Sequence, residues 1–121
     1  MTRKVLVIGC GSIFRRHQKA IANNSSFKLI AVCDIQKEIV SAISKQLGVK
    51  GFTDYKQAVL QADADFCVIA TPNSLHYEQS LFCLQNGCDI LVEKPVDFTR
   101  KRVNDILNVA RQERHNAYCV F

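Results

Sequence analysis

The chain has 121 residues, of which 48% are hydrophobic and 22% charged, a balance typical of one globular domain. No apolar run approaches the roughly 20 residues that a membrane-spanning helix needs, so we expect no membrane partner. The net charge is +5, but no helix-turn-helix or other nucleic-acid signature accompanies it, and we expect no nucleic-acid partner.

Short apolar runs alternate with helical periodicities along the whole chain. The runs show little polar alternation, which is typical of parallel strands buried on both faces; they cover residues 5–8, 29–33, 66–70, 90–92 and 117–121. Apolar residues at helical spacing fill the intervals, at 13–21, 35–47, 55–59, 77–84 and 103–110. The pattern predicts an α/β fold over residues 1–121, a doubly wound parallel sheet of the Rossmann type in a single domain.

Four residues predict where individual helices begin and end. Gly48 and Gly87 follow two of the periodic segments and predict helix C-termini. Ser74 and Thr99 precede two others and predict N-caps. His17 falls on the apolar side of the first helix, where we expect a core histidine with a hydrogen-bond partner.

All of the excess positive charge lies in the first 34 residues, where six cations stand against Asp34 alone. Arg15, Arg16 and Lys19 follow the first strand, and we expect them to form a solvated helix face. The alternative is that they attract an anionic cofactor or substrate.

Six cysteines occur without a Cys-x-x-Cys motif. Cys33, Cys67 and Cys119 belong to strand-like runs, where a cysteine acts as a small buried hydrophobic residue. We therefore expect free thiols in a reduced, cytoplasmic protein, with no metal site. The N-terminus leads directly into a strand, so we expect no cleavable signal.

The segment from Lys4 to Asp34 has the organisation of half a dinucleotide site. An apolar strand leads into Gly9-Cys10-Gly11, a helical pattern follows, and the next strand ends in Asp34. Gly9 permits a sharp turn, Gly11 leaves room for a pyrophosphate at the helix N-terminus, and the carboxylate accepts hydrogen bonds from a ribose. Asp34 has an alternative role as the N-cap of the next helix. Phe14 occupies the place of the usual third glycine, which predicts a raised or tilted helix.

Three segments follow one another at the ends of the predicted strands: residues 9–17 (GCGSIFRRH), 70–76 (ATPNSLH) and 93–95 (EKP). Their order and spacing resemble the N-terminal domain of the glucose–fructose oxidoreductase / inositol dehydrogenase / rhizopine catabolism (Gfo/Idh/MocA) family. Members of that family are NAD(P)-dependent oxidoreductases of sugars, inositols or sugar nucleotides. They carry a second α/β domain, which holds a histidine in many members and which we expect to be absent from this chain.

The resemblance implies a role for each matching residue. Ser12 and Ile13, with the two glycines, are implied to lie along the pyrophosphate. Thr71, Pro72, Asn73 and His76 are implied to line the nicotinamide-ribose side, although a helix-terminal contact is the alternative for His76. Lys94 is implied to be the catalytic lysine, and Glu93 and Lys94 are both implied to border the cofactor. Glu93 and Pro95 are implied to fix the loop of Lys94.

These expectations combine into two functional hypotheses. The first is the NAD(P)-binding domain of an oxidoreductase that moves hydride between nicotinamide and a hydroxyl-bearing carbon of a sugar, inositol or sugar nucleotide. We expect NAD rather than NADP, because Asp34 repels a 2′-phosphate and Ile35 supplies no cation. The second is a free-standing nucleotide-binding or redox-sensing module. Assembly into a homo-oligomer is left open, as is an ordinary surface location for Lys94.

Overall fold

The computed structural model of the chain describes residues 2–94 and 99–119. These residues form one six-stranded sheet, parallel throughout, with five helices. In chain order the elements are β1 (Arg3–Ile8), α1 (Phe14–Ala22), β2 (Phe27–Cys33), α2 (Lys37–Leu47), β3 (Lys50–Phe52), α3 (Tyr55–Gln61), β4 (Phe66–Ile69), α4 (Asn73–Gln85), β5 (Asp89–Val92), α5 (Arg100–Glu113) and β6 (Ala117–Cys119).

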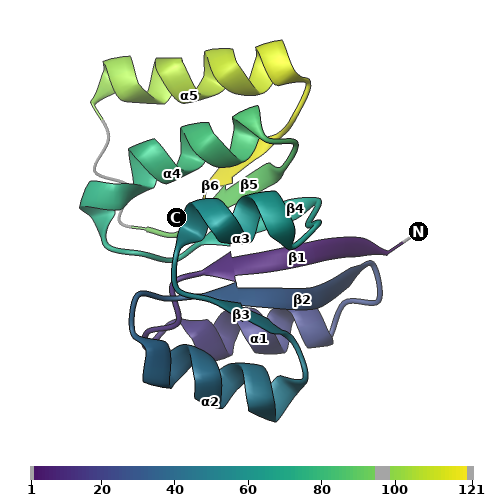
Figure 1. The fold of residues 1–121 in the computed structure, drawn as a ribbon. Coiled ribbons are helices and arrows are strands. Elements are labelled where there is room, and N and C mark those ends of the chain that lie inside the picture. Colours follow the sequence, from purple (N-terminus) through teal and green to yellow (C-terminus); the bar gives the residue numbers. More distant parts are fainter. Residues whose placement is uncertain (1, 95–98, 120–121) are drawn as a thin grey trace.

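The strand order is β3-β2-β1-β4-β5-β6, which confirms the predicted doubly wound sheet. From β1 the chain progresses toward one edge through β2 and β3, and from β4 toward the other edge through β5 and β6. Figure 1 shows α1 and α2 on one face of the sheet and α3, α4 and α5 on the other. The direction reverses between the neighbouring strands β1 and β4, where open α/β sheets bind ligands beyond the carboxyl ends of their strands.

Two apolar clusters cover the two faces of the sheet. In β1, Leu6 and Ile8 belong to the cluster beneath α3 and α4, whereas Val5 and Val7 belong to the cluster beneath α1 and α2. All four side chains are at most 2% exposed. Burial on both faces explains why the sequence shows continuous apolar runs instead of alternation.

The helix boundaries confirm three of the four predicted signals. Gly48 ends α2 in the left-handed conformation, Gly87 has a positive φ just after α4, and the Thr99 hydroxyl accepts the Arg102 N–H at the start of α5. The Ser74 prediction is wrong. The N-cap is Pro72, two residues earlier, and α4 begins at Asn73; the Pro72 φ of −58° suits a helix start, and its carbonyl accepts the Leu75 N–H.

Two local predictions differ from the structure at the β2–β3 side of the sheet. Ile35 precedes α2 and is 86% exposed, because Asp34 accepts the Gln36 N–H and holds residues 34–36 in a turn. The strand β3 was not predicted, since Lys50-Gly51-Phe52 carries a charge and a glycine in three residues.

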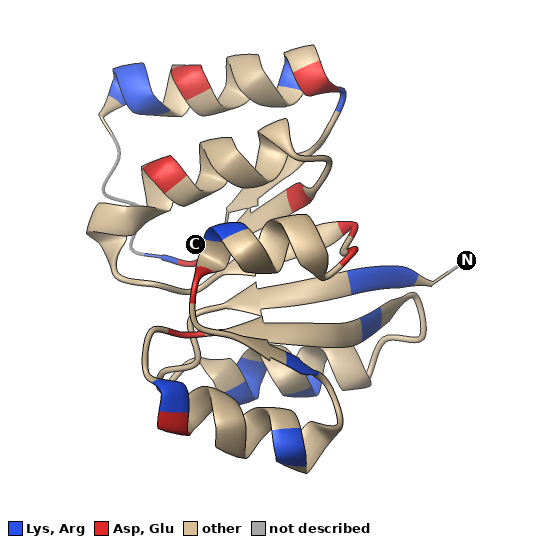
Figure 2. Ribbon diagram, viewed as in Figure 1, with Lys and Arg blue, Asp and Glu red and all other residues tan. Residues whose placement is uncertain are grey.

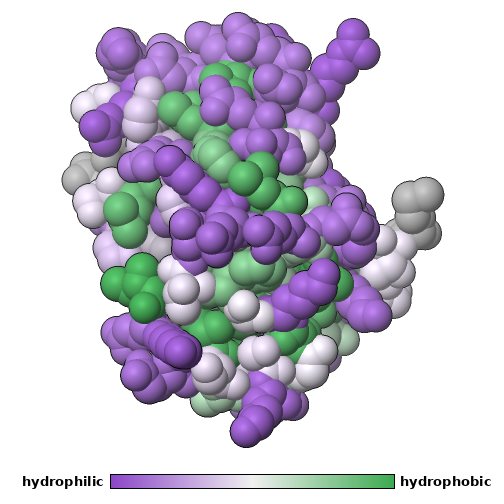
Figure 3. All heavy atoms as spheres, in the orientation of Figure 1, coloured by the Kyte–Doolittle hydropathy of each residue, from purple (hydrophilic) through white to green (hydrophobic). Residues whose placement is uncertain are grey.

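Charged side chains are distributed mainly over the helices and the strand starts (Figure 2). Arg3 and Lys4 begin β1 and pair with Asp89 and Asp63 at the same end of the sheet. On the face drawn in Figure 3, hydrophilic side chains cover most of the surface, and apolar side chains gather between α2 and α3 over the β2–β3 edge. Across the described ranges, no helix combines the length and apolarity needed to cross a bilayer.

Candidate functional site

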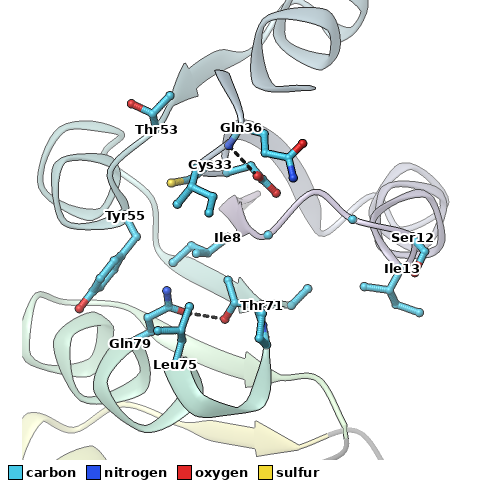
Figure 4. Close-up of a pocket in the computed structure, with 16 residues that line it drawn as sticks. Ile8, Ser12, Ile13, Cys33, Gln36, Thr53, Tyr55, Thr71, Leu75 and Gln79 are labelled. Atoms are coloured by element: carbon cyan, nitrogen blue, oxygen red, sulfur yellow. Dashed lines mark hydrogen bonds between the residues drawn. The ribbon is translucent and has the colours of Figure 1, made fainter. Parts of the chain in front are cut away.

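A cleft of about 430 Å³ opens at the carboxyl ends of β1, β2 and β4. Figure 4 shows Ser12 and Ile13 at one side of it, near the start of α1, and Tyr55 and Gln79 at the opposite side. The predicted residues that line it are Gly9, Gly11, Ser12, Ile13, Asp34, Thr71 and Pro72. The topological switch point therefore holds the cleft that the glycine turn predicted.

Glycine occupies the two positions of the turn for different structural reasons. Gly9 has a φ of +102°, and a Cβ atom there would lie 2.6 Å from the carbonyl oxygen of Ala70. Its N–H donates to the Cys33 carbonyl at 2.7 Å, which ties the turn to β2. Gly11 lies outside the positive-φ region, and a Cβ there would meet no protein atom within 4 Å. The space beside Gly11 is thus open to a ligand.

The start of α1 faces the cleft without a side-chain cap. Its N-cap, Ile13, makes no side-chain capping bond, and its first turn contains no acidic residue. The Phe14 and Arg16 N–H groups already donate to the Gly11 and Ile13 carbonyls, but a helix N-terminus keeps a partial positive charge that favours a phosphate. Phe14 occupies core space beneath the helix, where it is 1% exposed and clusters with Val7 and Val32. The third-glycine position therefore contributes to the core in this chain.

Asp34 closes the turn from the end of β2. Its Oδ2 accepts the Cys10 N–H at 2.8 Å, and its Oδ1 accepts the Gln36 N–H at 2.9 Å. Gln36, and not Asp34, is the N-cap residue of α2, so the alternative prediction is wrong in that detail. Each carboxylate oxygen keeps capacity for a further donor, as ribose hydroxyls would require.

The wall formed by β4 and α4 is held by two short hydrogen bonds. The Thr71 hydroxyl donates to Gln79 Oε1 at 2.6 Å (Figure 4). The Thr71 carbonyl lies 2.6 Å from His76 Nε2, on a histidine that is 1% exposed. His76 thus supports the wall from behind and does not itself line the cleft.

The remaining predicted residues also lie outside the cleft lining. Asn73 is the half-buried first residue of α4. Glu93 is 8% exposed; its Oε1 lies 3.0 Å from His17 Nε2, and its Oε2 accepts the Lys94 N–H at 2.9 Å. His17 is therefore the hydrogen-bonded core histidine that the sequence predicted. Lys94 is exposed just beyond β5, and Pro95 falls outside the described residues.

Nine of the sixteen lining residues were not among the predicted site residues, and five of them come from α4, from the segment after β3 and from the residue before α2. Leu75 and Gln79 are four residues apart on α4 and share one helix face. Thr53 and Tyr55 follow β3, and Gln36 precedes α2. The Tyr55 hydroxyl donates to Glu78 Oε1 at 3.3 Å, and burial, followed by the charge of Glu78, raises the pKa of Tyr55 to about 12. Recognition of β3 as a strand would have placed Thr53 and Tyr55 at this edge.

Burial disfavours the thiolate form of the two cysteines near the cleft. Burial, followed by the charge of Asp34, raises the pKa of Cys10 to about 12, and burial raises that of Cys33 to about 12 as well. A reactive cysteine requires a lowered pKa and exposure, so these two residues do not support the redox-sensing hypothesis. Within the part of the chain that the structure describes, no group of three His, Cys, Asp or Glu side chains is arranged to hold a metal ion.

The strand order and the cleft at the switch point are those of dinucleotide-binding Rossmann domains, and that is the class of protein that the structure defines. The chain belongs to the GFO_IDH_MocA family, described as "Oxidoreductase family, NAD-binding Rossmann fold", whose model matches residues 3–120. The predicted family is confirmed, and the chain is an NAD-binding oxidoreductase domain.

Relatives of this chain include sugar and inositol dehydrogenases. A D-glucoside 3-dehydrogenase of Escherichia coli is 30% identical over 111 residues, which are 90% of this chain and 32% of that protein. A scyllo-inositol 2-dehydrogenase (NADP(+)) of Bacillus subtilis is 27% identical over 106 residues, or 87% of this chain and 32% of that protein. The chain thus spans about a third of the length of these relatives.

A solved structure shows the same fold with ligands. The WlbA dehydrogenase from Bordetella pertussis, in complex with NADH and UDP-GlcNAcA, superimposes with a TM-score of 0.92 at 26% identity. The match covers 99% of this chain and 37% of that one. The similarity therefore extends through all six strands but over little more than a third of the solved enzyme.

Proposed function

We propose that this chain binds the cofactor of a dehydrogenase that acts on a ring hydroxyl of a sugar, an inositol or a sugar nucleotide. The observation that carries the proposal is the cleft with an open glycine turn at one side and the Asp34 carboxylate beside it. The residues fit a dinucleotide, because the space at Gly11 is open, the start of α1 is uncapped and Asp34 keeps acceptor capacity. The relatives supply the substrate class.

In this proposal each wall of the cleft binds one part of the cofactor. Gly9, Gly11, Ser12 and Ile13 hold the pyrophosphate through backbone N–H groups and close approach. Thr71 and Pro72 form the wall beside the nicotinamide ribose, supported by Asn73 and His76 from α4. NAD, when bound, supplies the hydride acceptor.

We propose Lys94 as the catalytic residue and Glu93 as its support. Nζ of Lys94 would hydrogen-bond the substrate hydroxyl and, as the neutral amine, accept the hydroxyl proton as the carbon gives up its hydride to the nicotinamide. Lys94 is exposed at the carboxyl end of β5, next to β4, so its side chain has room to approach a substrate beyond the cleft.

We propose a cytoplasmic location for the protein. The reducing conditions of the cytoplasm suit a chain with six free cysteines.

We propose that NAD is preferred to NADP. Asp34 stands where a 2′-phosphate would approach, and the exposed Ile35 that follows it provides no positive charge. A carboxylate repels the phosphate, whereas it accepts hydrogen bonds from the free ribose hydroxyls.

The test is a titration of the purified chain with NADH and NADPH, followed by nicotinamide fluorescence. Asp34→Asn removes the charge, and we expect it to weaken NADH binding by about tenfold and to narrow the preference over NADPH. Asp54→Asn is the matched control, because Asp54 also accepts a backbone N–H two residues on, from Lys56 at 2.9 Å, but does not line the cleft. Equal affinity of the unmodified chain for both cofactors would overturn the NAD preference, and the absence of binding would overturn the site.

A further inference from the structure

A buried hydrogen-bonding contact links helix α1 to the residue that follows β5. His17 lies one turn into α1 and Glu93 directly follows β5, and each residue is 8% exposed. Their side chains meet at 3.0 Å, between Nε2 and Oε1. An ionised carboxylate only accepts hydrogen bonds, so His17 Nε2 is the donor.

The second oxygen of Glu93 reaches the backbone of Lys94. Oε2 accepts the Lys94 N–H at 2.9 Å, while the Glu93 N–H itself donates to the Ile69 carbonyl at 2.9 Å. The main chain of Glu93 is thus held by β4. The orientation of its carboxylate, and with it the bond to the Lys94 N–H, depends on the contact with His17.

The backbone of His17 connects it to the lining of the cleft. The His17 N–H donates to the Ile13 carbonyl at 3.4 Å, and Ile13 is both the N-cap of α1 and part of the cleft lining. A continuous set of contacts therefore runs from the proposed phosphate position through Ile13, His17 and Glu93 to Lys94. A set of contacts alone does not establish coupling, which requires a measured response.

We propose that His17 is a positioning residue: through Glu93 it fixes the backbone of Lys94 relative to α1, so that a phosphate bound at the start of α1 changes the environment of Lys94. The inference rests on the proposed function, in which that helix start binds the cofactor pyrophosphate and Lys94 acts on the substrate. His17 is a core histidine, and neither its burial nor its position on the apolar helix face would by itself indicate this positioning role.

The chain offers a matched control for a purely structural role. His115 Nδ1 lies 3.0 Å from Asp89 Oδ1, so this pair has the same chemistry and the same length. Asp89 begins β5 at the opposite end from Glu93. A substitution of His115 therefore removes a comparable contact without touching the link to Lys94.

The first measurement is hydrogen exchange at the Lys94 amide by NMR on lysine-labelled protein, with Lys94→Arg to assign the signal. His17→Leu removes the donor but keeps apolar bulk, and we expect it to accelerate exchange at Lys94 by about tenfold after correction for global stability. His17→Gln retains an N–H donor and is expected to restore most of the protection. His115→Leu is expected to leave exchange at Lys94 unchanged.

The second measurement tests the coupling with ADP as the ligand. ADP carries the diphosphate and adenosine but no nicotinamide, so a shift of the Lys94 amide signal cannot come from contact with the nicotinamide. We expect ADP to shift the Gly11, Ser12 and Lys94 amide signals in the unmodified chain and in His115→Leu. In His17→Leu we expect the shifts at Gly11 and Ser12 to remain and the shift at Lys94 to fall at least threefold.

The outcomes separate this inference from the proposed function. Unchanged Lys94 exchange in His17→Leu, or equal acceleration in His115→Leu, would overturn the positioning role. If bound ADP leaves the position of the Lys94 amide signal unchanged, the coupling is overturned. Failure of ADP to shift the glycine-turn signals would instead overturn the cofactor site, and the exchange comparison would still decide the role of His17. If His17→Leu does not fold, Glu93→Gln takes its place, because its single acceptor oxygen cannot serve both donors.

Discussion

The strand β5 has a carboxylate at each end, and the two ends serve different purposes. Asp89 begins the strand at the amino edge of the sheet, and Glu93 follows it at the carboxyl edge. Each carboxylate pairs with a histidine at 3.0 Å. The same chemical unit therefore occurs twice on one strand, which allows the two edges of the sheet to be compared directly.

At the amino edge the carboxylate accepts three hydrogen bonds. Asp89 accepts from the Arg3 guanidinium, from His115 Nδ1 and from the Asn116 N–H, and so joins the starts of β1, β5 and β6. Burial acts to raise the pKa of Asp89, but the bonds from Asn116, Arg3 and His115 outweigh it and lower that pKa. This edge is a closed network that stabilises the fold.

At the carboxyl edge several groups keep unused bonding capacity. Asp34 has remaining acceptor positions, Gly11 faces open space and the start of α1 has no capping side chain. We expect the carboxylate–histidine pair at the amino edge to stabilise the sheet and the pair at the carboxyl edge to position Lys94. Changes at the amino edge should therefore affect stability, and changes at the carboxyl edge should affect binding.

The largest expected effect is on the amino edge. Asp89→Ala leaves the Arg3 charge and His115 without their partner, and we expect a loss of about 3 kcal/mol in the free energy of unfolding with NADH affinity retained. Urea denaturation followed by circular dichroism measures the loss. Lys101→Ala is the control, because the Lys101–Asp105 pair is mostly exposed and should contribute less than about 0.5 kcal/mol. A loss of NADH affinity in folded Asp89→Ala would contradict the expectation that the amino edge contributes to stability and not to binding.

A smaller and opposite effect is expected at the glycine turn. Gly11→Ala places a methyl group in the open space where the pyrophosphate is proposed to lie, and we expect NADH affinity to fall by at least about tenfold, or about 1.4 kcal/mol. Stability should be unchanged or higher by up to about 1 kcal/mol, since Gly11 does not need a positive φ. Fluorescence titration and urea denaturation on the same sample give both quantities. Full retention of NADH binding would show that the ligand does not approach Gly11.

The smallest expected effect is the pH dependence of folding stability that arises from the Asp89 carboxyl group. Its pKa is lowered in the folded state, so its contribution is complete above the unfolded-state pKa of about 3.9 and is lost as the pH falls through the folded-state value. We expect the urea midpoint to fall more steeply between pH 5 and pH 3 in the unmodified chain than in Asp89→Ala. Parallel profiles for the two proteins would assign the acid sensitivity to other carboxylates.

Much of the sheet could be predicted from the sequence, because buried parallel strands have continuous apolar runs. The run that leads to Gly9 and the run that ends at Asp34 also located the cleft. The sharp turn at Gly9 requires glycine for a local reason, its positive φ, which does not depend on the rest of the fold. The strand β3 could not be predicted, because Gly51 and Lys50 give it no apolar signal. Its pairing with β2 in the folded protein, and not its own propensity, makes it a strand.

The contacts behind the cleft could not be predicted at all. His17 and Glu93 are 76 residues apart in the chain, and their contact arises only because β5 lies next to β4 and α1 covers β1. The helical pattern also wrongly included Ile35, since nothing in a periodicity indicates that Asp34 accepts the Gln36 N–H. Side-chain hydrogen bonds to the backbone override periodicity at element boundaries, where the site residues of this fold lie.

The buried thiols have a consequence for measuring local opening. Five of the six cysteines are at most 6% exposed, in two separate apolar clusters, and only Cys119 is half-buried. A thiol reagent reacts with a buried cysteine only when the surrounding structure opens. The rate of reaction of each cysteine therefore reports the opening of its own region: Cys119 that of the edge strand β6, Cys33 that of the cleft lining, and Cys67 and Cys83 that of the sheet beneath α4.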